Sequence, residues 1–123
     1  MSVHQKYDLQ ERLVKFSASI ILNVGGLNKN FASEHLIKQL IRSSTSSALN
    51  YGEAQSAESR RDFVHKMKIC LKELRESQVN LQVLKEAQLI NDLEEFEKIT
   101  QECKELVAIF TSSIKTSISK ISD

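Results

Sequence analysis

The fold is decided by the stretch SRRDFVHKMKICLKELRESQVNLQVL, residues 59–84. Seven positions in it, separated by alternating steps of four and three, are Phe63, Met67, Cys70, Leu74, Ser77, Leu81 and Leu84. Six of the seven are apolar, a heptad pattern that places them on one side of an α-helix. Val64, Leu71 and Gln78 form a second flank beside them. The buried arc is therefore wider than a single coiled-coil seam, as a helix bundle requires.

Composition agrees with an all-α chain. The 123 residues contain no proline and only three glycines, fewer than a β-sandwich or an α/β sheet would need for its turns. The length suits one domain, residues 1–123, and the hydrophobic and charged fractions, 41% and 27%, are globular. Seventeen basic and sixteen acidic residues leave +1, so the whole chain has no large field to attract nucleic acid or an acidic membrane.

Three more amphipathic segments flank this stretch. We predict helices at about residues 8–27, 33–55, 59–88 and 91–121, with Asp8, Ser33, Ser59 and Asn91 as the residues that begin them. The segment Gly25-Gly26, followed by residues 28–30, ends the first helix, and Phe31 is expected to plug one end of the bundle. Four such helices joined by short polar links predict an up-and-down antiparallel four-helix bundle.

Residues 43–47 are five consecutive hydroxyl residues, Ser-Ser-Thr-Ser-Ser, with mediocre helix propensity. Nothing in this run fixes a turn, and Leu49-Asn50-Tyr51 can continue the helical register. We therefore predict a continuous second helix, in which the small side chains let a neighbouring helix approach closely.

The sequence also indicates where the protein resides. No apolar run approaches the roughly 18 residues that span a bilayer, and residues 1–6 lack the apolar centre of a secretory signal. Cys70 and Cys103 both lie on apolar stripes, where a free thiol behaves as a small hydrophobe. These features predict a cytoplasmic protein with two buried thiols and no membrane partner.

Catalytic chemistry finds no support in the sequence. A di-iron bundle needs two Glu-x-x-His motifs, and the only approximation is Asp62-Phe63-Val64-His65. A serine nucleophile would need a Gly-x-Ser-x-Gly turn or an oriented base, and neither Gly25-Gly26 nor Gly52 matches a phosphate-binding loop. We expect no catalytic residue, no metal, no cofactor and no small-molecule substrate.

A basic stripe is the strongest functional signal. Arg61, His65, Lys68, Lys72 and Arg75 follow steps of four and three, displaced by two residues from the apolar seam and so by about 200°. The candidate nucleic-acid contacts are the lysines and arginines of this stripe together with the neighbouring Arg60: Arg60, Arg61, Lys68, Lys72 and Arg75.

Two interpretations of the basic stripe stay open. In one, its charges pair with the acidic segment 92–105 of the same or a neighbouring subunit. In the other, it follows the phosphates of RNA or DNA. No aromatic residues interleave with the basic ones, which disfavours base stacking.

A second polar group lies near the predicted interior. It comprises Arg42, Asn50 and Glu53 on the second predicted helix and Glu73 and Glu76 beside the seam of the third. Charges close to a bundle interior must be paired and hydrogen-bonded. We expect a structural network of arginine and carboxylates, within one chain or between chains.

Several of these residues resemble a known family. The segments QLIRSSTSSALNYGEA (39–54), AESRRDF (57–63), Lys66-Met67 and LKELRES (71–77) resemble the four-helix-bundle proteins encoded in intervening sequences of bacterial 23S ribosomal RNA genes, often labelled S23-like ribosomal proteins. The similarity covers about residues 9–110 in helix order. Asn80 departs from it, because many relatives carry an aromatic residue there.

The resemblance implies a small antiparallel bundle that assembles as a ring, usually a pentamer, without known enzymatic activity. A similar accessory protein of diversity-generating retroelements is more basic and binds nucleic acid. We therefore expect a non-enzymatic, homo-oligomeric scaffold that assembles with itself as a pentamer, the usual ring that the resemblance implies. The alternative is an RNA- or DNA-binding accessory module that uses the basic stripe.

Overall fold

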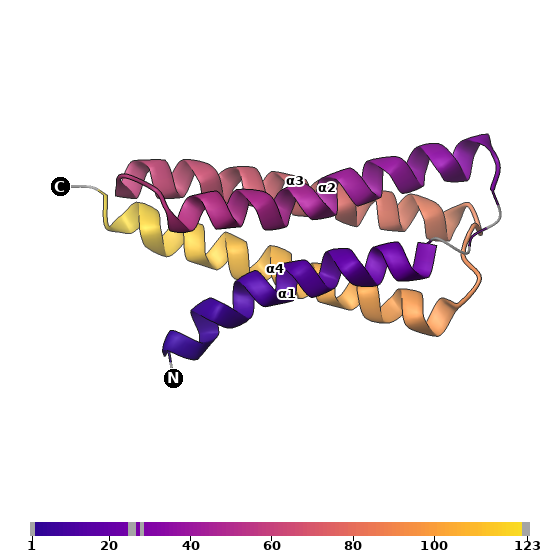
Figure 1. Ribbon diagram of the computed structural model, residues 1–123, viewed down its shortest axis with the longest axis horizontal. Coiled ribbons are helices and arrows are strands. Elements are labelled where there is room, and N and C mark those ends of the chain that lie inside the picture. Colours follow the sequence, from indigo (N-terminus) through magenta and orange to yellow (C-terminus); the bar gives the residue numbers. More distant parts are fainter. Residues whose placement is uncertain (1, 25–26, 28, 122–123) are drawn as a thin grey trace.

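A computed structural model describes residues 2–24, 27 and 29–121, with side chains from Leu9 onward. In this part of the chain it contains four helices and no strand: α1 (Ser2–Val24), α2 (Phe31–Gln55), α3 (Arg60–Glu86) and α4 (Leu93–Ser119) (Figure 1). None of these helices is long and apolar enough to cross a membrane. The all-α, single-domain prediction is confirmed.

The four helices run up and down along one axis (Figure 1). The backbone of each helix lies close to those of its two neighbours in the cycle α1–α2–α3–α4, and the diagonal helices meet only through side chains in the core. The contact between α2 and α3 is the most extensive, and that between α1 and α4 is the sparsest. The α2–α3 pair is therefore the most closely packed part of the bundle.

The seam of α3 lies in the core as its spacing predicts. Met67, Cys70 and Leu74 are fully buried, and they pack with apolar residues of the other three helices. Phe110 of α4 is also fully buried, and its ring meets that of Tyr51 edge to face at a centroid distance of 5.7 Å. The apolar stripes of all four helices thus meet in one core.

The hydroxyl run 43–47 is helical, as expected. Ser43, Ser44 and Ser47 of α2 are fully buried, and Ser43 meets α3, where its Oγ lies 2.7 Å from Ser77 Oγ. The Ser43 hydroxyl also contacts the Leu40 carbonyl oxygen, and that of Ser47 donates to the Ser44 carbonyl oxygen. Because these hydroxyls find partners on their own helix, they can be buried without a large free-energy penalty.

Two predicted helix starts were wrong in α1 and α2. Helix α1 begins at Ser2, so Asp8 lies inside it, and it ends at Val24 rather than residue 27. Gly25, Gly26 and Asn28, predicted to end it, lie outside the described residues. In α2 the N-cap is Asn30: its Oδ1 accepts from Ser33 N at 2.8 Å, while Ser33 Oγ accepts from Asn30 N at 3.0 Å. The reciprocal capping box explains why the helix starts before Ser33.

The starts of α3 and α4 were predicted more accurately than those of α1 and α2. Ser59 caps α3, its side chain accepting from Asp62 N at 3.0 Å. Helix α4 is capped by Asp92 rather than Asn91, because the Asp92 carboxylate reaches Glu95 N at 3.1 Å. The two helices end at Glu86 and Ser119, two residues earlier than predicted in each case.

Phe31 does not plug the bundle. It is the first residue of α2, and its side chain is 89% exposed. Leu22, near the end of α1, is also exposed. The end of the core is closed instead by the buried side chains of Val24 and Leu27.

The close α2–α3 contact predicts the effect of enlarging Ser43. Ser43→Leu should lower the free energy of unfolding by about 2 kcal/mol, because the larger side chain pushes α2 away from Ser77. Ser43→Ala, which keeps the volume small, should cost about 1 kcal/mol or less. Urea unfolding followed by circular dichroism measures both. Ser112→Leu on the exposed side of α4 is the matched control, and a Ser43→Leu protein as stable as that control would contradict the packing.

Candidate functional site

The five basic candidates of the stripe all lie on α3 and are all exposed: Arg60, Arg61, Lys68, Lys72 and Arg75. Counted from Leu74 at the centre of the seam, each of Lys68, Lys72 and Arg75 is rotated by about 100° to 160° at 100° per residue. Within the described part of the chain, none of the five forms an ion pair. The stripe therefore faces solvent, and its five cations have no ion-pair partner in this part of the chain.

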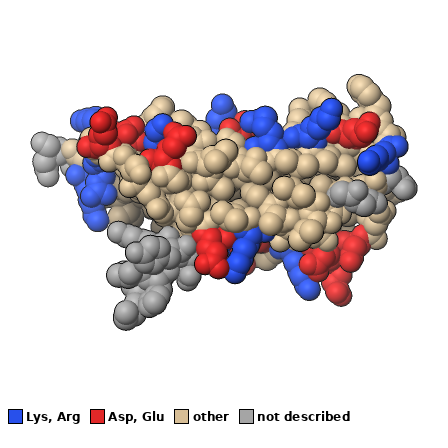
Figure 2. Space-filling model, viewed as in Figure 1, with Lys and Arg blue, Asp and Glu red and all other residues tan. Residues whose placement is uncertain are grey.

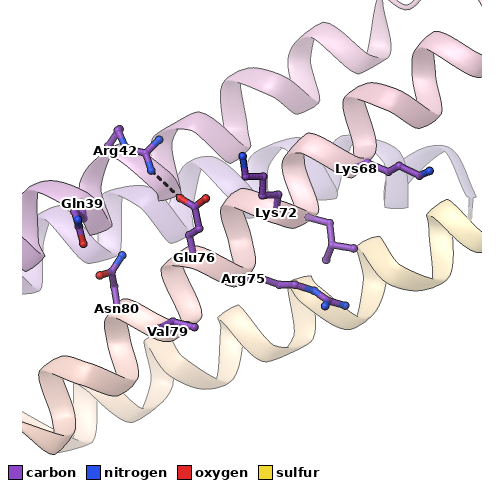
Figure 3. Close-up of a pocket in the computed structure, with 9 residues that line it drawn as sticks. Gln39, Arg42, Lys68, Lys72, Arg75, Glu76, Val79 and Asn80 are labelled. Atoms are coloured by element: carbon purple, nitrogen blue, oxygen red, sulfur yellow. Dashed lines mark hydrogen bonds and ion pairs between the residues drawn. The ribbon is translucent and has the colours of Figure 1, made fainter.

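Three of these residues line an open groove of about 790 Å³ on the α2–α3 side of the bundle. Lys68, Lys72 and Arg75 follow one another along α3, and Arg42 faces them from α2 (Figure 3). Arg60 and Arg61 do not line the groove and lie in the first turn of α3. The structure thus divides the predicted candidates into a group of three at the groove and a pair at the helix start.

Four acidic side chains of α4 form ion pairs with cations outside the basic stripe. Glu102 and Glu105 bind Arg12 of α1, at 2.6 and 3.2 Å from its Nη2. Glu97 pairs with Lys85 at 3.2 Å, and Glu95 pairs with Lys98 of its own helix at 3.4 Å. Pairing between the stripe and α4 of the same chain is therefore absent among the described residues, since other cations hold these carboxylates.

Although the net charge is only +1, unpaired acidic and basic side chains are distributed differently over the molecule. In the described part of the chain, the carboxylates with neither an ion pair nor a cap are Glu34, Glu58, Glu86 and Glu94. They come from three helices and one linker, whereas the five unpaired cations of the stripe share one helix. Helix α3, with seven Lys and Arg against four Asp and Glu, therefore has the largest positive excess of the four helices.

The second predicted group forms a chain of polar contacts between α2 and α3. Arg42 Nη2 lies 2.7 Å from Glu76 Oε1, and its Nη1 lies 3.4 Å from Glu73 Oε1. Ser46 Oγ donates to Glu73 Oε2 at 3.2 Å, and Asn50 Nδ2 donates to the Ser46 carbonyl oxygen at 2.9 Å. The hydrogen bond to Glu76 and the charge of Glu73 raise the pKa of Arg42.

Glu53 lies apart from this chain of contacts. Its Oε1 is 2.8 Å from Lys66 Nζ, so it joins α2 to α3 nearer the start of α3. Ser46 and Lys66 were not among the predicted residues, although Ser46 stands one helical turn before Asn50. Their participation depends on which side chains meet across the α2–α3 contact, which residue spacing on one helix does not reveal.

The polar contacts are structural in character. Glu73 is buried, and it accepts from both Ser46 and Arg42, as a buried carboxylate must. Arg42 is 59% exposed, so water screens its attraction to both carboxylates. Their effect is to fix Arg42 at the rim of the groove, where Figure 3 shows it turned toward Glu76.

The side chains that metal or thiol chemistry would use lie apart from one another or are buried in the described part. It holds no group of three or more His, Cys, Asp and Glu residues that could bind a metal. Burial raises the pKa of Cys70 and of Cys103 to about 12, so both thiols stay protonated near neutral pH. His35 and His65 are exposed and lie on different helices.

Comparison with known proteins identifies a family that this chain matches. The family model described as 23S rRNA-intervening sequence protein matches residues 5–112. A similar crystal structure, at 1.70 Å resolution, is of a protein of unknown function from the S23 ribosomal protein family of Bacteroides thetaiotaomicron. It is 28% identical, with a TM-score of 0.74, over 89% of this chain and 97% of the other. No curated protein matches the sequence.

The exposure of Arg42 predicts a small, salt-dependent coupling with Glu76. In a double-mutant cycle of Arg42→Gln and Glu76→Gln, the coupling free energy should be about 0.5 kcal/mol and should fall as salt rises. Glu73→Ala should cost about 1–3 kcal/mol, because it leaves Ser46 and Arg42 without their acceptor. Urea unfolding at two salt concentrations measures these values. A coupling insensitive to salt would contradict the screened geometry.

Proposed function

This chain belongs to the 23S rRNA-intervening sequence protein family, and we propose that it works as a non-enzymatic homo-oligomeric scaffold, a pentameric ring. The observation that carries the proposal is an uncharged face formed by α1 and α2. Figure 2 shows a broad band without charged side chains in the view in which these two helices lie in front (Figure 1).

The α1 part of this face contains Val14, Ala18 and Ile21, spaced by four and three. Val14 is 51% exposed and Ile21 46% exposed, although both side chains are apolar. They lie on the side of α1 next to α2, because Gln10, one turn before Val14, donates from Nε2 to the Ala48 carbonyl oxygen at 3.1 Å. Apolar residues on this side are available for contact with another subunit.

The α2 part of the face continues without charge. Ile41, Thr45, Ala48 and Gly52 follow steps of four, three and four on the side that meets α1. A Cβ added to Gly52 would lie 3.5 Å from Gln10 Oε1, so the two helices are close at this point. Small and apolar side chains on both helices suit close packing against a second copy.

Two arguments support the proposed ring: the resemblance to a family whose members usually assemble as rings, and symmetry. A face on α1 and α2 that met a different face of the next copy would be a heterologous contact, which closes as a ring when the rotation fits. The stripe on α3 then recurs around the ring, one copy per subunit. We propose the cytoplasm as its location, because two free buried thiols suit a reducing compartment.

Binding of RNA or DNA by the α3 stripe is the second candidate. It is favoured by the five unpaired cations on one helix, since phosphate contacts by lysine and arginine supply most of the non-specific affinity for nucleic acid. Repetition around a ring would strengthen such binding by multivalency. The near-zero net charge of the whole chain opposes it.

Assembly predicts a mass well above 14.0 kDa for the purified protein. Size exclusion with light scattering at micromolar concentration should give about five protomers, the closed ring of a heterologous contact. The double variant Val14→Glu with Ile21→Glu should lower that mass, because it places carboxylates in the apolar contact. Ala108→Glu with Thr116→Glu, at exposed positions of α4, is the matched control. A stable wild-type monomer would refute the proposal.

Nucleic-acid binding requires a steep dependence on salt. Affinity for a fluorescently labelled structured RNA, measured by anisotropy, should fall sharply as salt rises. The variant Lys68→Glu with Lys72→Glu should abolish binding, whereas Lys104→Glu with Lys115→Glu on α4 carries the same charge change and should keep most of it. Equal binding by the two variants would reject the second candidate.

A further inference from the structure

The outer face of α3 does not end with its basic residues. After Lys68, Lys72 and Arg75, the same side of the helix continues with Val79 and Val83. Val79 is 56% exposed and Val83 41% exposed. The face therefore has two halves, a cationic half toward the start of α3 and an apolar half toward its end.

The groove spans the boundary between these halves. Its lining includes Lys68, Lys72 and Arg75 together with the apolar side chains of Leu71 and Val79 and the neutral amide of Asn80. Figure 3 shows Val79 and Asn80 continuing along α3 beyond Glu76, away from Lys68. A ligand that fills the groove therefore meets positive charge at one end and apolar surface at the other, with Glu76, which is paired with Arg42, between them.

A nucleic acid matches only one of these halves. Its backbone is anionic along its whole length, so it would satisfy the cations and leave both valines against charged phosphates. The groove lining contains no aromatic side chain on which an exposed base could stack. The apolar half therefore favours a protein ligand over RNA or DNA.

A second copy of this chain does not supply the complementary surface. Glu102 and Glu105 of α4 pair with Arg12, Glu97 pairs with Lys85, and Glu95 pairs with Lys98. In the part of the chain with described side chains, the remaining unpaired carboxylates come from different elements and form no stripe that could meet three cations in a row. The occupant must bring its own row of carboxylates.

We propose that this face docks an acidic, amphipathic helix of a different protein. Carboxylates one turn apart would pair with Lys68, Lys72 and Arg75, and apolar residues in the following turns would cover Val79 and Val83. From Lys68 to Val83 the face extends about 22 Å at 1.5 Å per residue, so a helix of about four turns covers it. The charges would set orientation and speed of association, and the apolar half would hold the helix in place.

The probes are two fluorescent peptides of about 18 residues, long enough for the face. One carries glutamates on the contact side of its first half and leucines on that of its second half, and the other has the halves in reverse order, so both chain directions are covered. Scrambled peptides of identical composition are the reference. Anisotropy should show that one designed peptide binds at least about tenfold more tightly than its scrambled form.

Two pairs of substitutions then test the two halves of the face. Lys68→Glu with Lys72→Glu and, separately, Val79→Ser with Val83→Ser should each weaken peptide binding at least about tenfold. Lys104→Glu with Lys115→Glu should leave it unchanged. All four positions of the face are exposed, and circular dichroism verifies that each variant keeps its helices. Equal affinity for designed and scrambled peptides would overturn the proposal.

An RNA oligonucleotide of equal charge separates the two classes of ligand. If it binds more tightly than either peptide and the valine variant binds it as well as wild type does, the face is a phosphate-binding surface and the proposal is overturned. Peptide binding measured with the Val14→Glu, Ile21→Glu variant separates docking on α3 from assembly of the oligomer. Docking on α3 should persist there per chain, so loss of the oligomer and loss of the docking site have different readouts.

Discussion

The contact between α2 and α3 is the constraint on which the rest of the molecule depends. It is close because Ser43 meets Ser77 of α3 with a small side chain, and the buried hydroxyls of Ser43, Ser44 and Ser47 all have partners. The same contact buries Glu73, which then requires donors from α2, and Ser46 and Arg42 supply them. Arg42 is thereby fixed at the rim of the groove. The groove and the outer face of α3 are consequences of how tightly two helices meet.

The division of charge among the helices gives the surface its character. Arg12 draws Glu102 and Glu105 of α4 toward α1, and Lys85 draws Glu97 toward α3. Because these three carboxylates are paired with other cations, they do not neutralise the basic stripe. A chain with a net charge of only +1 therefore presents a concentrated positive face on one helix and an uncharged face across two others.

The sequence predicted what depends on periodicity within one helix. The seam from Met67 to Leu84, the helical hydroxyl run and the outward basic stripe all follow from spacing on a single segment. The starts of α2 and α4 were predicted at the wrong residue, because Asn30 and Asp92 compete with neighbouring residues that also cap well. The pairing of Glu53 with Lys66, and of Arg12 with the acids of α4, could not be predicted, since long side chains on different helices choose among several partners within reach.

The unequal packing of the four helices has a consequence for local opening. Helix α1 has the sparsest contact with α4, and the ion pairs of Arg12 there are partly exposed to water. Detachment of α1 is therefore the sub-global fluctuation that disrupts the least buried structure, and its amides should exchange with solvent before those of α2 and α3. Since the uncharged face lies partly on α1, a neighbouring subunit bound there would hold this helix closed, and protein concentration would then control how often it opens.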